Sequence, residues 1–197
     1  LLSWRPDFIL SHTARAEVSK AFWRDLHVMA ELDAKLAAAG EKAVFFLSAS
    51  AGRTRTAAEI AAMEKKHDWP LEHVEGYPDL EGVEVNIDRY VKAFNRKARA
   101  SRAIFLNQVG WQHEVCGVRM PRTMLPIDIR IGSDVEFGLS AYEPFGAAQI
   151  EPLLAGTVCV LSRSCGGHTF VERVDIKKEL PNAIIRDYTA RLANASV

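Results

Sequence analysis

Two glutamates, Glu143 and Glu151, frame the part of this sequence whose residue types are best suited to chemistry. They lie eight residues apart, a little over two helical turns, so they share one face if the segment is a helix. A carboxylate accepts hydrogen bonds from neighbouring hydroxyl groups, and such charge-assisted bonds are about twice as strong as neutral ones. The pair therefore predicts a crevice that holds a ligand rich in hydroxyl groups.

The residues between these glutamates offer backbone N–H groups to an anion. Pro144 suits the first turn of a helix, and Gly146 allows a ligand to approach the main chain closely. Free N–H groups at such a helix start can receive a phosphate or sugar oxygen. Because strands are expected before and after this segment, we expect the site at the carboxyl edge of a parallel sheet.

The segment from residue 140 to residue 167 resembles a known motif over its whole length. It reads SAYEPFGAAQIEPLLAG, then TVCVL, then SRSCGG. This string is similar to the E-x7-E motif of retaining glycosyltransferases with two Rossmann-like domains, the GT-B group that contains glycogen and starch synthases and the group 1 enzymes. The resemblance implies that Glu143 contacts hydroxyls of the transferred sugar and Glu151 those of the ribose. It also implies that the sugar and phosphate contact the backbone of Phe145, Gly146, Ala147 and Ala148.

The start of the chain resembles the same family. After the apolar run FILS, Arg15 and Lys20 stand five residues apart, as in the family's S-R-L-x-x-x-K-G segment. The resemblance implies that this Arg and Lys contact the diphosphate and, with Glu143, form the catalytic set. A planar guanidinium and a compact ammonium both suit a departing diphosphate. With two cations and a helix start at the phosphates, we expect no metal and no cofactor.

Three positions depart from the family pattern. Ala21 replaces the Gly that follows the lysine, Pro152 replaces the Ala that follows the second glutamate, and Val158-Cys159 replaces Pro-Val. These changes affect packing and turn geometry more than they affect the charged groups.

Simpler interpretations exist for each site residue. Glu143 alone is compatible with a carboxylate at a helix start, and Glu151 with a solvated helix residue. Arg15 and Lys20 are compatible with exposed charges beside a helix. Two other functions also stay open: a non-catalytic regulatory module that binds a nucleotide sugar, and an interaction domain without a ligand.

Short apolar runs alternate with longer amphipathic ones, the pattern of a parallel sheet covered by helices. Strands are expected at residues 8–10, 43–47, 103–106, 135–139, 157–161 and 183–185. Helices are expected over 19–39, from Thr54 or Thr56 to about Lys66, and over 85–98. The stretch 119–133 is left open, because any helix there starts at or after Pro126 or is kinked by it. The fold class is therefore α/β, a Rossmann-like doubly wound parallel sheet that by resemblance is one half of a GT-B fold.

The length of 197 residues predicts one domain over 1–197. The resemblance implies that this domain binds a nucleotide sugar, with 67–100 as an insertion or extended connection. The formal net charge is zero, which argues against nucleic acid as a partner. No apolar run is long enough for a membrane span, and the start lacks a signal-peptide pattern. Three cysteines without ligand spacing favour a cytoplasmic protein.

By resemblance, the partner of this chain is a nucleoside-diphosphate sugar. The acceptor-binding N-terminal domain of the same enzyme is expected to be missing, because one chain of this length holds one core. We therefore expect the isolated chain to bind donor and to lack transfer activity.

Overall fold

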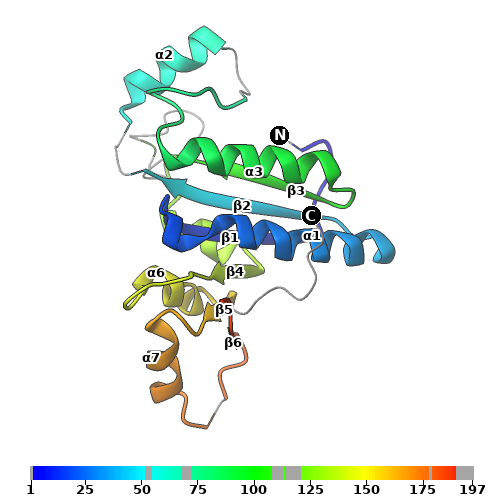
Figure 1. Cartoon of the computed structure of the whole chain (residues 1–197), viewed down its shortest axis with the longest axis vertical. Coiled ribbons are helices and arrows are strands. Elements are labelled where there is room, and N and C mark those ends of the chain that lie inside the picture. Colours follow the sequence, from blue (N-terminus) through cyan, green and yellow to red (C-terminus); the bar gives the residue numbers. More distant parts are fainter. Residues whose placement is uncertain are drawn as a thin grey trace.

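The computed structural model describes residues 2–51, 55–67, 72–107, 113, 121–177 and 179–189. Within these residues, six strands form one sheet whose neighbours all run parallel, in the order β3-β2-β1-β4-β5-β6 (Figure 1). The strands are β1 (Phe8–Arg15), β2 (Ala43–Ser50), β3 (Ser101–Leu106), β4 (Val135–Gly138), β5 (Val158–Ser162) and β6 (Ala183–Arg186). This topology confirms the expected Rossmann-like α/β fold class.

The strands form where apolar runs were expected, but β1 and β2 continue further at their carboxyl ends. Their register runs unbroken to Arg15 opposite Ser50. Ser48 and Ser50 are buried although they are polar, because strands covered on both faces leave little room for solvent. The apolar run alone marked only the first part of each strand.

Helix α1 (Phe22–Ala39) begins three residues later than the expected start at Ser19. A short 3-10 helix, η1 (Val18–Lys20), precedes it, and Ala21 between the two has a φ of 49°. This left-handed conformation interrupts the helical pattern, which is why the periodicity of the apolar residues did not locate the true start. The position is the one at which the resembling family has glycine.

Two further helices lie between β2 and β3. Helix α2 (Ala57–His67) begins after Thr56, whose side chain accepts the N–H of Glu59 while the Glu59 carboxylate accepts the N–H of Thr56. This reciprocal capping identifies Thr56 as the helix start, whereas Thr54 lies outside the described residues. Helix α3 (Val83–Lys97) forms close to its expected range.

Helices α1 and α3 lie side by side over the sheet and enclose much of the apolar core (Figure 1). The core side chains come from both helices and the central strands: Leu26, Met29, Leu36, Phe45, Leu47, Val91, Phe94, Phe105 and Phe137.

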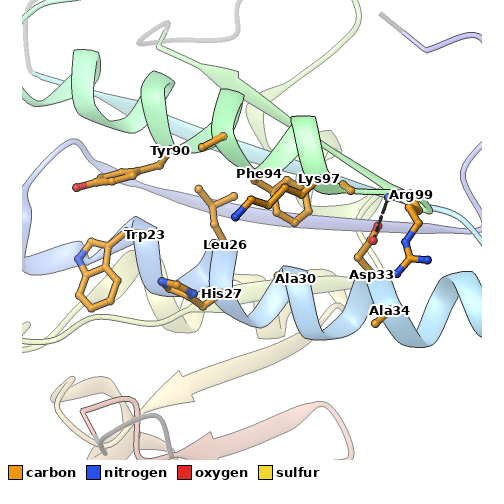
Figure 2. Close-up of a pocket in the computed structure, with 12 residues that line it drawn as sticks. Trp23, Leu26, His27, Ala30, Asp33, Ala34, Tyr90, Phe94, Lys97 and Arg99 are labelled. Atoms are coloured by element: carbon orange, nitrogen blue, oxygen red, sulfur yellow. Dashed lines mark hydrogen bonds between the residues drawn. The ribbon is translucent and has the colours of Figure 1, made fainter. Parts of the chain in front are cut away.

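Asp33 of α1 is tied to the residues between α3 and the start of β3 (Figure 2). Its carboxylate accepts the N–H groups of Arg99 and Ala100 at 3.0 and 2.9 Å and the Ser101 hydroxyl at 2.6 Å. Burial alone would raise the pKa of Asp33, but these hydrogen bonds outweigh it and hold the pKa below its ordinary value.

A buried ion pair joins Arg55, which precedes α2, to Glu84 in the first turn of α3. Residues 68–71 lie outside the described part. Arg55 donates to the Asn107 carbonyl at 2.9 Å and pairs with Glu84 at 2.8 Å, and Glu84 also accepts the N–H of Ala51 at 2.7 Å. The start of α3 is therefore fixed against the residues that follow β2 and β3.

The second half of the chain contains α5 (Pro126–Ile131), α6 (Ala147–Ile150), the 3-10 helix η3 (Glu151–Ala155) and α7 (Gly167–Val174). The expectation that Pro144 opens a helix reaching Glu151 was wrong. Helix α6 begins at Ala147, after Gly146 in a left-handed conformation, and it ends where Pro152 enters the chain. Proline has no N–H, so it cannot continue the α-helical hydrogen bonding.

Candidate functional site

The strand order β3-β2-β1-β4-β5-β6 places a topological switch point between the carboxyl ends of β1 and β4. From β1 the chain proceeds outward through β2 and β3 on one side, and β4, β5 and β6 extend on the other. Open α/β sheets bind ligands outside such a switch point, where the loops after two adjacent strands diverge. Here these loops are residues 16–21 after β1 and 139–146 after β4, with 163–166 after the neighbouring β5.

Backbone hydrogen bonds join these three loops. The N–H of Ala141 donates to the Ser19 carbonyl at 2.8 Å. Glu143 exchanges two bonds with the loop after β5, because its N–H donates to the Ser164 carbonyl at 3.2 Å and its carbonyl accepts from Gly166 at 2.9 Å. The three loops at the switch point therefore hold one another in place.

Two glycines permit this close packing. A Cβ on Gly166 would lie 2.0 Å from the Pro144 carbonyl oxygen, which is backbone and cannot swing away. Gly146 has a φ of 77°, and a Cβ there would meet the Gln149 side chain at 2.1 Å and the Cys165 sulfur at 2.7 Å. Both positions therefore require glycine.

Lys20 and Glu143 meet where the loop after β1 comes together with the loop after β4. The Lys20 ammonium forms an ion pair with Glu143 Oε2, although 123 residues separate the two in sequence. The Lys20 side chain is 4% exposed and that of Glu143 is 19% exposed. The structure thus brings together two residues that the sequence resemblance singled out in separate segments, and it holds each as the counter-ion of the other.

Arg15 lies at the carboxyl end of β1 but points to solvent. Its side chain is 76% exposed and pairs with Glu17 at 3.2 Å. An exposed pair of this kind contributes little to stability and is easily exchanged for another partner. The structure places Arg15 at the carboxyl edge of the sheet without joining it to Lys20 or Glu143.

Glu151 pairs with Arg130 rather than sharing a site with Glu143. Arg130 Nη1 lies 2.6 Å from Glu151 Oε2, and Arg130 Nη2 donates to the Ala148 carbonyl at 3.3 Å. In a continuous helix the N–H of residue 152 would donate to that carbonyl, but Pro152 has none. Arg130 therefore donates a hydrogen bond to the Ala148 carbonyl, which has no helical donor because residue 152 is a proline.

The same guanidinium faces a buried acid. Glu136 of β4 is 1% exposed, and its Oε2 lies 3.5 Å from Arg130 Nε. Burial raises the pKa of Glu136 to about 7, although the charge of Arg130 opposes the shift. Arg130 thus links a buried carboxyl group beneath the sheet edge to an exposed carboxylate, Glu151, at the surface.

A second buried network braces the start of α1, next to Lys20. The Tyr188 hydroxyl donates to Asp25 at 2.8 Å and lies 2.9 Å from the Ala21 carbonyl, and His12 Nδ1 lies 2.6 Å from Asp25. Burial raises the pKa of Asp25, while its hydrogen bonds from His12 and Tyr188 oppose the shift. The chain after β6 is thereby held against the turn that carries Lys20.

The predicted phosphate-binding backbone surrounds the start of α6. Phe145 is half exposed and meets Phe170 of α7 edge-on, with ring centroids 6.3 Å apart. Among the described residues, no acceptor pairs with the N–H groups of Ala147 and Ala148. These groups remain open to solvent or to a ligand.

Sequence reasoning missed Arg130, Glu136 and Tyr188. Glu136 offered a signal, because a carboxyl group between Val135 and Phe137 is unusual in a buried strand. Arg130 lies in a stretch whose helical pattern is obscured by prolines, and nothing in the sequence marked Tyr188 as a brace for α1.

A groove of about 470 Å³ lies between α1 and α3, away from these loops (Figure 2). Trp23 and Tyr90 stand at one end of it, and Lys97 and Arg99 at the other. None of the sequence-predicted site residues lines this groove.

Two general properties of the described ranges bear on the site. No group of three or more His, Cys, Asp or Glu residues there is arranged to hold a metal ion. Every helix in those ranges is too short or too polar to cross a bilayer.

No protein-family model and no curated protein sequence matches the chain. Solved structures do resemble it. One is a UDP-forming α,α-trehalose-phosphate synthase from Burkholderia xenovorans, with a TM-score of 0.56 at 13% identity over 94% of this chain and 34% of that one. Another is a sucrose-phosphate synthase from Thermosynechococcus elongatus, with a TM-score of 0.53 at 18% identity over 93% of this chain and 33% of that one.

A third similar structure, described as trehalose-6-phosphate from E. coli, is bound with UDP-2-fluoro glucose. Its TM-score is 0.55 at 16% identity, over 92% of this chain and 33% of that one. The chain thus spans about a third of the length of the structures it matches. At these identities the likeness establishes the fold, which resembles one domain of retaining GT-B glycosyltransferases.

Proposed function

We propose that this chain is the donor-binding domain of a retaining glycosyltransferase and holds a nucleoside-diphosphate sugar at the switch point between β1 and β4. The observation that carries the proposal is the ion pair between the buried Lys20 and the partly buried Glu143 at the switch point of the sheet. The resemblance near the start of the chain pointed to Lys20, and the resemblance over residues 140–167 pointed to Glu143. A chance resemblance would give no reason for the two to meet at the switch point.

The diphosphate occupies the Lys20 side of this switch point. Lys20 lies in a loop at the carboxyl edge, and its ammonium is already desolvated, so an anion that replaces Glu143 gains a strong charge-assisted bond. Arg15 stands exposed at the end of the same strand and is free to turn toward the phosphates. The two cations stabilise the negative charge that grows on the departing diphosphate as its bond to the sugar breaks.

The transferred sugar binds at one of the two glutamates, and the ribose binds at the other. Glu143 is released from Lys20 by the diphosphate and accepts hydroxyls of the transferred sugar. Glu151 is about half exposed and accepts the ribose hydroxyls. The open N–H groups of Ala147 and Ala148 and the backbone of Phe145 and Gly146 contact sugar and phosphate oxygens between them.

The complete enzyme has a second, acceptor-binding domain. This follows from the proposed reaction, because transfer needs an acceptor positioned against the donor sugar, and positioning supplies a large part of such rates. The chain spans about a third of its structural matches, so residues 1–197 act as a single donor domain within a longer protein. The isolated chain binds donor and does not transfer.

The experiment is a thermal-shift screen with UDP-, ADP- and GDP-glucose in the presence of EDTA. One of the three should raise the melting temperature, and the Lys20→Met variant should lose most of that rise. Equal responses of wild type and Lys20→Met to every nucleotide, or no response to any, would remove the proposal. A response that depends on added magnesium would contradict the metal-free assignment.

A further inference from the structure

Arg130 of α5 contacts three acceptors, which come from η3, α6 and β4. Its guanidinium reaches the exposed carboxylate of Glu151, the backbone carbonyl of Ala148 and the buried carboxyl group of Glu136. Only about an eighth of its side chain is exposed, so its position is fixed by packing as well as by charge. The planar fork of arginine is the side chain suited to several acceptors in one plane.

The cause of this arrangement lies in Pro152. The residue that follows Glu151 cannot donate a backbone hydrogen bond, so α6 ends after one turn and the Ala148 carbonyl loses its helical partner. Without a replacement, the turn that carries Glu151 would lack a fixed direction. The Arg130 side chain fills the gap, and the same group then pairs with the Glu151 carboxylate.

The pairing leaves one oxygen of Glu151 available. Arg130 takes Oε2 at 2.6 Å, and within the described part of the chain nothing pairs with Oε1. The carboxylate is therefore held by one oxygen and offers the other to solvent. A carboxylate held in this way has one preferred direction in which to accept a hydrogen bond from a hydroxyl group.

We propose that Arg130 is a positioning residue that orients Glu151 to read the ribose hydroxyls of the nucleotide, replacing the helical hydrogen bond that Pro152 removes. This inference rests on the proposed function, since it assumes that Glu151 faces a ribose. If Arg130 has this role, the preference of the site for a ribonucleotide over its 2′,3′-dideoxy analogue depends on Arg130.

The test compares two ligands on four proteins by calorimetric titration. The ligands are whichever of UDP, ADP and GDP binds wild type most tightly and the matching 2′,3′-dideoxynucleoside diphosphate. The proteins are wild type, Arg130→Gln, Arg130→Lys and the control Arg102→Gln, which removes an exposed arginine on β3. Wild type should prefer the ribonucleotide by roughly tenfold or more, the value of one charge-assisted hydrogen bond.

Arg130→Gln should lose most of this preference while it keeps the affinity for the dideoxy ligand, which shows that the site is still folded. Arg130→Lys should restore part of the preference because it keeps the charge beside Glu151. Arg102→Gln should match wild type. If Arg130→Gln keeps the wild-type preference, or weakens both ligands in equal proportion, the inference is overturned.

Failure of the proposed function gives a different pattern. In that case wild type binds none of the nucleotides, or Glu151→Gln leaves the ribose preference of wild type unchanged. If wild type binds and Glu151→Gln abolishes the preference while Arg130→Gln does not, only the role of Arg130 is wrong.

Discussion

Lys20, which is buried, and Glu143, which is partly buried, form an ion pair that joins the loop after β1 to the loop after β4. Breaking one partner of such a pair leaves a charge that is poorly solvated, which typically costs roughly 3 kcal/mol of stability. Glu143→Gln should therefore lower the free energy of unfolding by about that amount. The double variant Lys20→Met, Glu143→Gln should be less destabilised than the sum of the single variants, and urea denaturation of all four proteins measures this. Additive losses would show that the pair contributes no coupling.

Ala21 predicts a stabilising substitution. It is a non-glycine residue in a left-handed conformation, which costs roughly 1 kcal/mol or more. Ala21→Gly should therefore be neutral or more stable by up to about 1 kcal/mol, despite the loss of a buried methyl group. The matched control is Ala30→Gly, an exposed position within α1, the helix that Ala21 precedes, which should lose about 1 kcal/mol. Similar losses for both variants in urea denaturation would count against the assigned backbone conformation.

Glu136 predicts a dependence of stability on pH. Its pKa is raised by burial from 4.5 to about 7, so the folded protein retains a proton that the unfolded chain has lost. Stability associated with this group is full below pH 4.5 and is lost as pH rises to about 7, by about 3 kcal/mol. Glu136→Gln should remove that loss and be more stable than wild type at pH 8.

The control for this prediction is Glu31→Gln on an exposed position of α1, which should keep the wild-type profile. Unfolding in urea at intervals from pH 4.5 to pH 8 provides the comparison. A Glu136→Gln variant whose stability falls with pH as steeply as that of wild type would contradict the assignment.

The contacts of His73, which lies against β3 at one edge of the sheet, predict a second dependence of stability on pH. Its two ring nitrogens face Asp79 at 2.9 Å and the Phe105 carbonyl at 3.0 Å, so both can donate only when the ring is protonated. Burial alone would lower the pKa of His73, but the hydrogen bond and charge of Asp79 and the carbonyl outweigh it and raise the pKa. The stability from this contact is full below pH 6.5 and is lost as pH rises through the raised pKa.

His73→Gln should therefore be destabilised most at pH 6 and least at pH 9. The ring-proton signals of His73, followed by NMR titration, should report a pKa above that of a free histidine. A normal or lowered value would show that the imidazole is held neutral.

The fold was predictable because burial alone positions its strands. Apolar runs such as Ala43 to Leu47 located each strand, and the Gly40 cap and regular spacing located the end of α1. The ends of β1 and β2 were not predictable in this way, because Ser48 and Ser50 are polar residues buried by the tertiary structure. The start of α1 was obscured by the conformation of Ala21, which no periodicity reveals.

The sequence nominated charged residues for a candidate site but did not reveal their partners. A motif identifies Lys20, Glu143 and Glu151 by type and spacing, since the proposed chemistry needs those groups. It does not show that the first two pair with each other or that Glu151 pairs with Arg130. The second contact depends on a carbonyl that Pro152 leaves vacant, and its partner comes from a separate helix, so only the three-dimensional structure brings them together.

The measurement that tests the central claim most directly is a calorimetric titration of wild type, Lys20→Met, Glu143→Gln and Glu151→Gln with a nucleoside, its diphosphate and its diphosphate glucose. Lys20→Met should weaken diphosphate binding by roughly 1 to 3 kcal/mol and leave the nucleoside unchanged. Glu151→Gln should weaken all three ligands. Glu143→Gln should bind the bare diphosphate at least as tightly as wild type, because no carboxylate competes for Lys20, and should lose the additional affinity contributed by glucose. If every variant loses affinity for every ligand in the same proportion, or wild type binds none of them, these residues do not form a donor site.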